Sequence, residues 1–295
     1  MERVLRDRRA VWLFVGPALA VYTAIMLIPI CWSVGYTLFQ GGPIEGYKYV
    51  GLQNYTRLIH DPNFWAAFRF TVEYAVLVTV GEVVFGLVLA LTYQFYLRRA
   101  SALVRTLVFF PVVLPTVAVA QMFVKLFAIS PQNGLVNSFL STVGLTSLVR
   151  DWLGSSNGAF TVIVLMDIWR SMGFFAILLY AGLVDIPEDI IEAARVDGAT
   201  GIGLIRRIVL PMMRPIMVSA IIFSINGTLK VFDTVLALTA GGPGNATTPL
   251  TLLMYNTSFN FGDYGYGSTI ALALTILCLL ATITLFGASR RDVTA

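Results

Sequence analysis

Charged side chains are scarce in this chain of 295 residues. Asp, Glu, Lys and Arg make up 12% of it, which is about half of what a soluble domain usually carries. Charge is absent altogether between Arg9 and Glu45, between Arg105 and Lys125, and between Asp263 and Arg290. Uncharged, mostly apolar runs longer than about 18 residues are typical of helices that span a membrane. The sequence therefore excludes an ordinary soluble domain.

Residues that hold metals or form disulfides are almost missing. His60 is the only histidine, and Cys31 and Cys278, the only cysteines, lie at opposite ends of the chain. No Cys-x-x-Cys pair occurs, so we expect no metal or haem site, and we expect both cysteines to pack inside membrane spans. A catalytic set of Ser, His and Asp or of Cys and His would need His60, which lies in a predicted outer loop.

The motif that cradles ATP phosphates in P-loop enzymes is missing too. That motif ends in Gly-Lys followed by Ser or Thr, and its lysine contacts the phosphates. Only Lys48, Lys125 and Lys230 occur, and none of them follows a glycine. We therefore predict that the chain is not an enzyme and binds no cofactor itself, so that any motion driven by ATP must come from a partner.

The apolar runs predict six membrane spans. They cover approximately 11–39, 71–97, 106–128, 158–182, 212–239 and 264–288. Backbone amides in hydrocarbon must bond within their own segment, and these runs lack the alternation of barrel strands, so helices are expected. The predicted fold is an all-α membrane protein that forms a single domain over residues 1–295, with three Gly/Pro-rich outer connections at 40–70, 129–157 and 240–263.

The positive charges predict the orientation, because Lys and Arg are enriched in cytoplasmic loops. Most of the 20 basic residues fall on the side of both termini: Arg3, Arg6, Arg8, Arg9, Arg98, Arg99, Arg105, Arg195, Arg206, Arg207, Arg214, Arg290 and Arg291. Fewer fall on the other side: Lys48, Arg57, Arg69, Lys125, Arg150 and Lys230. Both termini are therefore predicted to be cytoplasmic. The N-terminus resembles a signal peptide, but its apolar run continues to Phe39, which is too long, so a retained first span is expected.

One cytoplasmic connection, between the fourth and fifth spans, has a helical pattern of its own. Asp185 and Glu188 have the spacing of a capping box, which predicts a helix over Ile186–Asp197 that ends at a left-handed Gly198. We expect Glu188, Glu192 and Arg195 on one face, and Ile186, Ile190, Ala193 and Ala194 on the other. A second short helical turn is expected over Leu204–Leu210. An interfacial helix on lipid is the alternative, but the acidic, alanine-rich composition favours packing against protein.

The same connection carries a family motif: Glu-Ala-Ala, three residues, Gly, nine residues, and Ile-x-Leu-Pro. It resembles the loop of the permease subunits of binding-protein-dependent ABC importers, with Ile205 a mild departure where an aromatic is frequent. The resemblance implies that residues 186–211 form a coupling loop whose helix docks into a groove on an ATPase subunit. The residues to which it gives this role are Glu192, Ala193, Ala194, Asp197, Gly198, Ile208, Leu210 and Pro211.

Further stretches resemble the carbohydrate-importing, maltose-type branch of that family. They are Phe14–Ala18, Val50–Tyr55, Gly134–Asn137, Ala181–Leu183 with Ile186-Pro187, and Phe232-Asp233 with Leu238–Pro243. The resemblance implies a multi-pass protein of a prokaryotic cell membrane that transports a di- or oligosaccharide. Its implied partners are a second permease subunit, two ATPase subunits that hold ATP and magnesium, and an external solute-binding protein; nucleic acid is not among them.

Three ionisable residues fall inside predicted spans, where charge is costly and usually faces a cavity or a neighbouring helix. Asp167 and Arg170 are three residues apart and can pair on one helical face, and Glu82 lies in the second span. A purely structural role is one alternative. An ion-coupled secondary transporter that uses these residues is another, although no inverted repeat is visible. A scaffold subunit is a third.

The fourth and fifth spans combine aromatic and hydroxyl side chains, the mixture that a sugar site needs. The resulting substrate pathway is predicted to use Trp169, Arg170, Ser171, Phe174, Ser224, Gly227, Thr228 and Val231, most of them through the resemblance. Small residues that only pack helices together are the alternative. Arg170 departs from the family pattern and indicates either an anionic or larger substrate, or simply a partner for Asp167. Lys230 and Asp233 are expected at the outer mouth, where they could pair.

Overall fold

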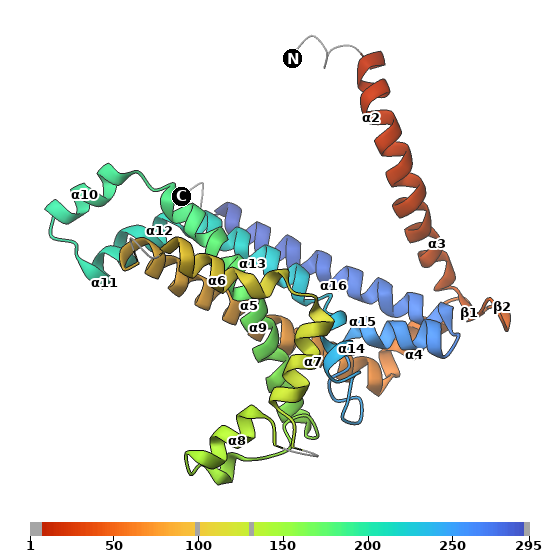
Figure 1. Cartoon of the computed structure of the whole chain (residues 1–295). Coiled ribbons are helices and arrows are strands. Elements are labelled where there is room, and N and C mark those ends of the chain that lie inside the picture. Colours follow the sequence, from red (N-terminus) through yellow and green to blue (C-terminus); the bar gives the residue numbers. More distant parts are fainter. Residues whose placement is uncertain (1–7, 98–100, 130–132, 292–295) are drawn as a thin grey trace. The chain divides into compact units, whose positions relative to one another are not determined.

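The computed structural model describes residues 8–97, 101–129 and 133–291, with side chains from residue 12 to residue 287. Arg3, Arg6, Arg98 and Arg99, on which part of the orientation prediction depends, lie outside the described residues. The chain divides into two compact units, each made of two segments. Unit 1 contains residues 1–64 and 253–273, and unit 2 contains residues 65–252 and 274–295. Figure 1 shows the elements of both units along the sequence.

Unit 1 begins with one long apolar helix. It consists of α2 (Arg8–Tyr22), a π-helical turn η1 (Thr23–Leu27) and α3 (Ile28–Tyr36). The π turn precedes Pro29, whose ring nitrogen cannot donate the helical hydrogen bond. Residues Trp12–Tyr36 are long and apolar enough to cross a membrane, and 0% of this span's most apolar window is buried within the chain.

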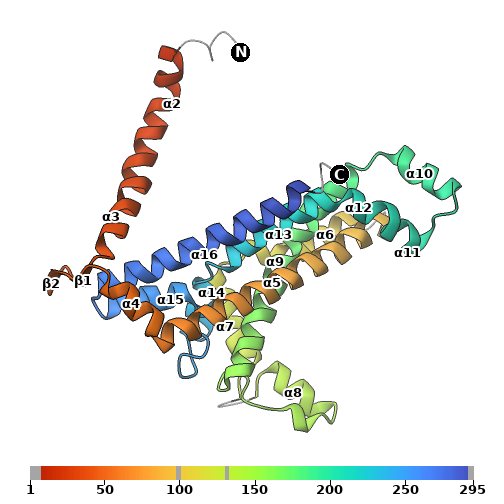
Figure 2. The same ribbon diagram turned by 180° about the vertical axis from the view of Figure 1, so that it is seen from behind.

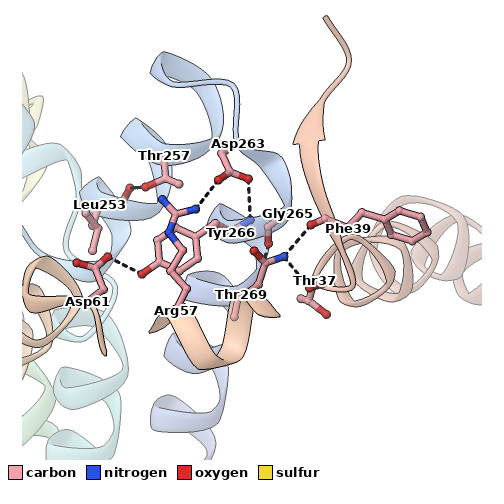
Figure 3. A network of polar contacts seen from close by, with 11 residues as sticks. Thr37, Phe39, Arg57, Asp61, Leu253, Thr257, Asp263, Gly265, Tyr266 and Thr269 are labelled. Atoms are coloured by element: carbon pink, nitrogen blue, oxygen red, sulfur yellow. Dashed lines mark hydrogen bonds and ion pairs between the residues drawn. The ribbon is translucent and has the colours of Figure 1, made fainter. Parts of the chain in front are cut away.

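A small hairpin follows in unit 1. Strands β1 (Phe39–Gly42) and β2 (Gly46–Tyr49) pair antiparallel, with Phe39 opposite Tyr49. The next helix, α4 (Gln53–His60), contributes the buried Asn54, whose amide nitrogen donates to the carbonyl oxygens of Thr37 at 2.9 Å and Phe39 at 2.7 Å. Figure 3 shows these bonds beside the start of the last helix. The amide of Asn54 thus fixes the position at which the hairpin leaves the first span.

Every secondary-structure element in the described part of unit 2 is a helix, and turns and loops connect these helices. Its elements are most of α5 (Pro62–Phe95), then α6 (Ser101–Val113), α7 (Thr116–Leu126), α8 (Leu135–Thr142), η2 (Thr146–Leu148), α9 (Ser156–Val184), α10 (Glu188–Val196), α11 (Gly201–Leu204), η3 (Ile205–Val209), α12 (Leu210–Met212), α13 (Arg214–Thr228) and α14 (Asp233–Leu238). α15 (Leu250–Tyr255) and α16 (Tyr264–Arg291) belong partly to each unit, and η4 (Asn256–Asn260) lies in unit 1. Figure 2 shows α10 and α11 beyond the C-terminal end of α9, and α8 beyond its N-terminal end.

Close helix packing explains one glycine of unit 2. Gly173 of α9 is buried, and a Cβ atom there would lie 2.2 Å from the carbonyl oxygen of Val108 in α6. Any side chain at this position would therefore separate the two backbones. Small residues at such contacts are typical of helices in membranes, where packing and not the hydrophobic effect holds helices together.

The structure confirms the predicted all-α membrane fold, to which it adds the short hairpin of β1 and β2. Among the described residues, four helices are long and apolar enough to cross a membrane, or up to six if each of two bent pairs counts as one span. The first bent pair is α6 with α7, which meet at 97° within the predicted span 106–128. Pro115 lies at this bend. A proline disfavours helical conformation at the residue before it, here Leu114, so α6 ends at Val113. The second predicted span begins at Pro62, earlier than the expected residue 71.

The predicted fifth span over 212–239 is wrong as a single helix. α13 ends at Thr228, and α14 starts separately at Asp233. The break lies at Phe232, whose φ of −141° and ψ of −63° are not helical. The second bent pair is instead the segment Gly201–Met212 with α13, at 69°. The outer connection 240–263 also contains helical turns, in α15 and η4, that the Gly/Pro pattern did not predict.

Candidate functional site

The loop between α9 and α13 contains the predicted coupling helix, with different bounds. α10 covers Glu188–Val196, and the residue before it is Pro187, with no side-chain cap. The predicted capping box is wrong: Asp185 ends α9, and its N–H donates to the carbonyl oxygens of Ala181 and Leu183. The helix α9 extends two residues beyond its predicted end, so Asp185 is not available to start α10.

The end of α10 follows the prediction. Gly198 has φ +85°, which confirms the expected left-handed glycine. Its N–H donates to the carbonyl oxygen of Arg195 at 3.0 Å, and that of Ala199 donates to Ala194 at 2.8 Å. These two bonds form the Schellman pattern that satisfies the last carbonyl groups of a helix. The chain can therefore reverse sharply between α10 and α11.

One face of the coupling loop is anchored in the interior of unit 2. Ile191, Ala194, Leu204 and Val209 belong to one buried apolar cluster with residues of the long helices, among them Leu183. The predicted apolar face is therefore only half correct: Ala194 and Ile186 are buried, but Ile190 and Ala193 are exposed. The hydrophobic pattern locates an apolar stripe but not which edge of it meets the core.

The other face of the loop is open. Of the residues that the motif singles out, Glu192, Ala193, Asp197, Gly198 and Pro211 are exposed, and Ile208 and Leu210 are half-buried. Two large apolar side chains join them, Val196 at 88% exposure and Ile202 at 81%. Neither residue was predicted from the sequence, although Val196 lies two residues before the motif glycine Gly198 and Ile202 lies between Gly201 and Gly203. A charged and apolar surface on a loop that is held to the core can transmit a push from a partner to the spans.

The predicted substrate residues meet at a cavity of about 400 Å³ inside unit 2. Seven of the eight line it: Arg170, Ser171, Phe174, Ser224, Gly227, Thr228 and Val231. Trp169 does not, because it points to α7, where its ring lies 5.8 Å from that of Phe123. Val231 lines the cavity although α13 ends before it, so the predicted helical face is replaced by a turn.

Several lining residues were not predicted. Val112 and Thr116 come from the bent pair α6 and α7, Phe223 from α13, and Phe232 and Thr234 from the break and α14. Two of them carry a sequence signal: Phe223 is a neighbour of the assigned Ser224, and Phe232 belongs to a stretch that resembles the family. The rings of Phe174 and Phe223 lie 5.3 Å apart, and those of Phe174 and Phe175 also 5.3 Å apart, so aromatic surface forms one part of the wall.

Hydroxyl and charged groups line other parts of the wall. The buried Glu82 of α5 accepts a hydrogen bond from the hydroxyl of Ser224 at 2.5 Å, and Ser224 also lies 2.9 Å from Thr79. Lys230 and Asp233 both line the cavity and are exposed, but within the described residues no ion pair joins them, so their predicted pairing is wrong. Aromatic faces beside hydroxyl and charged groups are suited to a small polyhydroxy ligand.

The chain is similar to known proteins over nearly its whole length. Residues 82–291 match the family described as binding-protein-dependent transport system inner membrane component. The chain is 35% identical to the probable ABC transporter permease protein YurN of Bacillus subtilis, over 92% of this chain and 93% of that protein. It is 34% identical to the trehalose/maltose transport system permease protein MalF of Thermococcus litoralis, over 97% and 96% of the two chains.

The fold has a close match among solved structures. A chain of the bacterial alginate ABC transporter, in complex with its alginate pentasaccharide-bound periplasmic protein, superposes with a TM-score of 0.84. The match covers 98% of each chain at 22% sequence identity. At this identity the likeness concerns the fold alone.

Proposed function

We propose a transport function because this chain belongs to the family of binding-protein-dependent transport system inner membrane components. With several helices apolar enough to cross a bilayer, it is a multi-pass membrane protein. We propose that it is the transmembrane subunit of an ATP-driven importer of carbohydrate. With a second permease subunit it forms the pathway for a di- or oligosaccharide in the cell membrane of a prokaryote.

The proposal rests on the fact that the Glu-Ala-Ala loop and the cavity lie in the same unit and share packed residues. The Glu-Ala-Ala loop is anchored by Ile191 and Ala194 in the same apolar cluster as Phe175 of α9, and Phe175 lines the cavity. A shift of the loop is therefore passed through packed side chains to the cavity wall. The similarity to a trehalose/maltose permease supports a sugar as the substrate.

The remaining partners follow from the same family. Two ATPase subunits bind ATP and magnesium, while this chain binds no cofactor. Their closure draws the coupling loops together, and an external solute-binding protein delivers the sugar to the outward-facing state, because ATP and the docked receptor both bind that state better. In this arrangement both termini and the loop 186–211 are cytoplasmic. No observation favours the alternative of an ion-coupled transporter through Glu82, Asp167 and Arg170.

Three variants test the two proposed roles, which are ATPase docking by the loop and sugar passage through the cavity. Replacing the exposed Glu192 by alanine, or Gly198 by proline, is expected to lower co-purification of the ATPase about tenfold while leaving membrane insertion intact. Proline cannot adopt the φ of +85° at Gly198 and lacks the N–H that bonds to Arg195. Phe174→Ala is expected to lower sugar uptake by a similar factor without changing ATPase docking.

The two alanine variants, Glu192→Ala and Phe174→Ala, each have a matched control. Glu45→Ala removes an exposed glutamate from the outer hairpin, and Phe139→Ala removes a phenylalanine that is 66% exposed on α8, away from the cavity lining. Neither control is expected to change docking or uptake. Normal ATPase co-purification with both loop variants would refute the assigned docking loop, and unchanged uptake would remove Phe174 from the pathway.

A further inference from the structure

The carboxylate of Asp167 is the centre of a buried network in unit 2. Asp167 is 6% exposed and lies in the middle of α9. Its Oδ2 accepts a hydrogen bond from the hydroxyl of Tyr74 in α5, and the hydroxyl of Thr234 in α14 lies 3.0 Å and 3.2 Å from its two oxygens. The Nε of Arg170 donates to Oδ1 at 3.3 Å. One carboxylate thus connects three helices and one cation.

Arg170 is only partly used by this contact. A guanidinium group has five N–H donors, and the contact with Asp167 engages the one on Nε. The side chain keeps 26% of its surface exposed and lines the cavity. The two Nη nitrogens can therefore donate to hydroxyl groups of a ligand, while Asp167 balances the charge of the guanidinium group.

The cavity as a whole carries no excess of positive charge. Its charged lining consists of two cationic side chains, Arg170 and Lys230, and three acidic ones, Glu82, Asp167 and Asp233. An acidic sugar that entered would meet Arg170 already paired with a buried carboxylate and two further carboxyl groups nearby. Like charges at short range in a partly desolvated site cost free energy, whereas an uncharged sugar meets only hydrogen-bond donors and acceptors.

We propose that Asp167 is a positioning residue that orients Arg170 in the cavity and balances its charge. The cavity thereby favours uncharged saccharides over acidic ones. The inference rests on the proposed function, sugar import, and assigns its substrate class. Of the two explanations that the sequence leaves open for Arg170, it favours a partner for Asp167, because the buried carboxylate balances the charge of the guanidinium group. Tyr74 and Thr234 hold that carboxylate in place.

The charge balance predicts a reciprocal rescue. Asp167→Asn leaves Arg170 as a lone cation in the wall, and Arg170→Gln leaves Asp167 as a lone buried anion. Each single variant is expected to lower ATP-dependent uptake of an uncharged sugar at least about tenfold. The double variant carries neither charge and is expected to recover to within about threefold of the unchanged transporter. A role of Asp167 that consisted only of holding α14 through Thr234 would not be rescued by changing Arg170.

The experiment uses the complete transporter with its own binding protein in proteoliposomes, and maltose, trehalose, lactose and digalacturonate as probes. The expected result is uptake of at least one uncharged disaccharide, little uptake of digalacturonate, loss in both single variants and recovery in the double variant. Full uptake by a single variant, or no recovery in the double variant, would overturn the proposal, as would preferential uptake of digalacturonate by the unchanged transporter. Uptake of no sugar at all would refute the proposed function itself, and the inference with it.

Discussion

Two arginine–carboxylate pairs in this chain use the same chemistry in different ways. In unit 1, Arg57 lies 2.7 Å from Asp263, with the arginine side chain half exposed. In unit 2, Arg170 lies 3.3 Å from Asp167, whose side chain is only 8% exposed. The first pair is close and exposed, and the second is looser and buried.

The ion pair of Arg57 and Asp263 in unit 1 has a further partner, Tyr266, on α16. The guanidinium carbon of Arg57 lies 3.8 Å from the ring centroid of Tyr266, and the hydroxyl of Tyr266 donates to Asp61 at 2.5 Å. The backbone N–H of Tyr266 also donates to Asp263 at 3.2 Å, as Figure 3 shows. These contacts join α4 to the start of α16, so the network acts as a clasp between the two helices.

The ion pair of unit 2 lies in the cavity wall. Asp167 is held by neighbours on three helices, and Arg170 lines the cavity. What distinguishes this pair is that its carboxylate is buried and held by two hydroxyl groups while its cation lines a cavity.

The largest effect is expected for Tyr74→Phe, which removes a hydroxyl donor from the buried carboxylate of Asp167. A hydrogen bond to a charged group contributes about 1.5–3 kcal/mol, so the free energy of unfolding should fall by about that amount, although Thr234 and Arg170 still contact the carboxylate. Thermal unfolding of the purified protein in detergent measures it. Tyr96→Phe is the control, because Tyr96 is 75% exposed. Equal shifts for the two variants would contradict the assigned network.

A smaller effect is expected for Tyr266→Phe, which removes the matching hydroxyl from the clasp. Its acceptor Asp61 is partly exposed, so water can replace the lost bond, and the ring that stacks on Arg57 remains. We expect a loss of about 1 kcal/mol in the same unfolding measurement, with sugar uptake unchanged. A loss larger than that of Tyr74→Phe would reverse the comparison between the two networks.

The smallest effect on stability is expected for Arg57→Gln. Exposed ion pairs contribute about 0.2–1 kcal/mol, and salt screens them. The variant should unfold slightly earlier at low salt and almost normally at high salt, whereas its sugar uptake should equal that of the unchanged transporter. If uptake fell as far as with Arg170→Gln, the distinction between a structural and a functional arginine would be lost.

The sequence predicted those features that local chemistry determines. Long apolar runs predicted the membrane helices, and Gly198 after an amphipathic segment predicted a left-handed residue, which the φ of +85° confirms. The helical pattern that ends at Gly198 located α10 to within two residues at its start and one at its end, although the capping box that was expected to start it is wrong. Each of these features depends on a few consecutive residues.

The features that failed depend on tertiary structure. Hydropathy does not register a bend, so the break at Phe232 and the 97° angle between α6 and α7 were not visible in the predicted spans. Trp169 directly precedes Arg170, but neighbours on a helix point about 100° apart, and Trp169 packs on Phe123 instead of lining the cavity. Thr234 reaches Asp167 only because α14 folds back onto α9.

The most direct test of the central claim is uptake of a radiolabelled uncharged disaccharide into proteoliposomes. One set contains the complete transporter, with its companion permease, ATPase and binding protein, and the other contains this chain alone. We predict uptake only by the complete set, only with ATP, and lost when Glu192 is replaced by alanine. Uptake by this chain alone under an ion gradient, without ATP or an ATPase, would contradict the account.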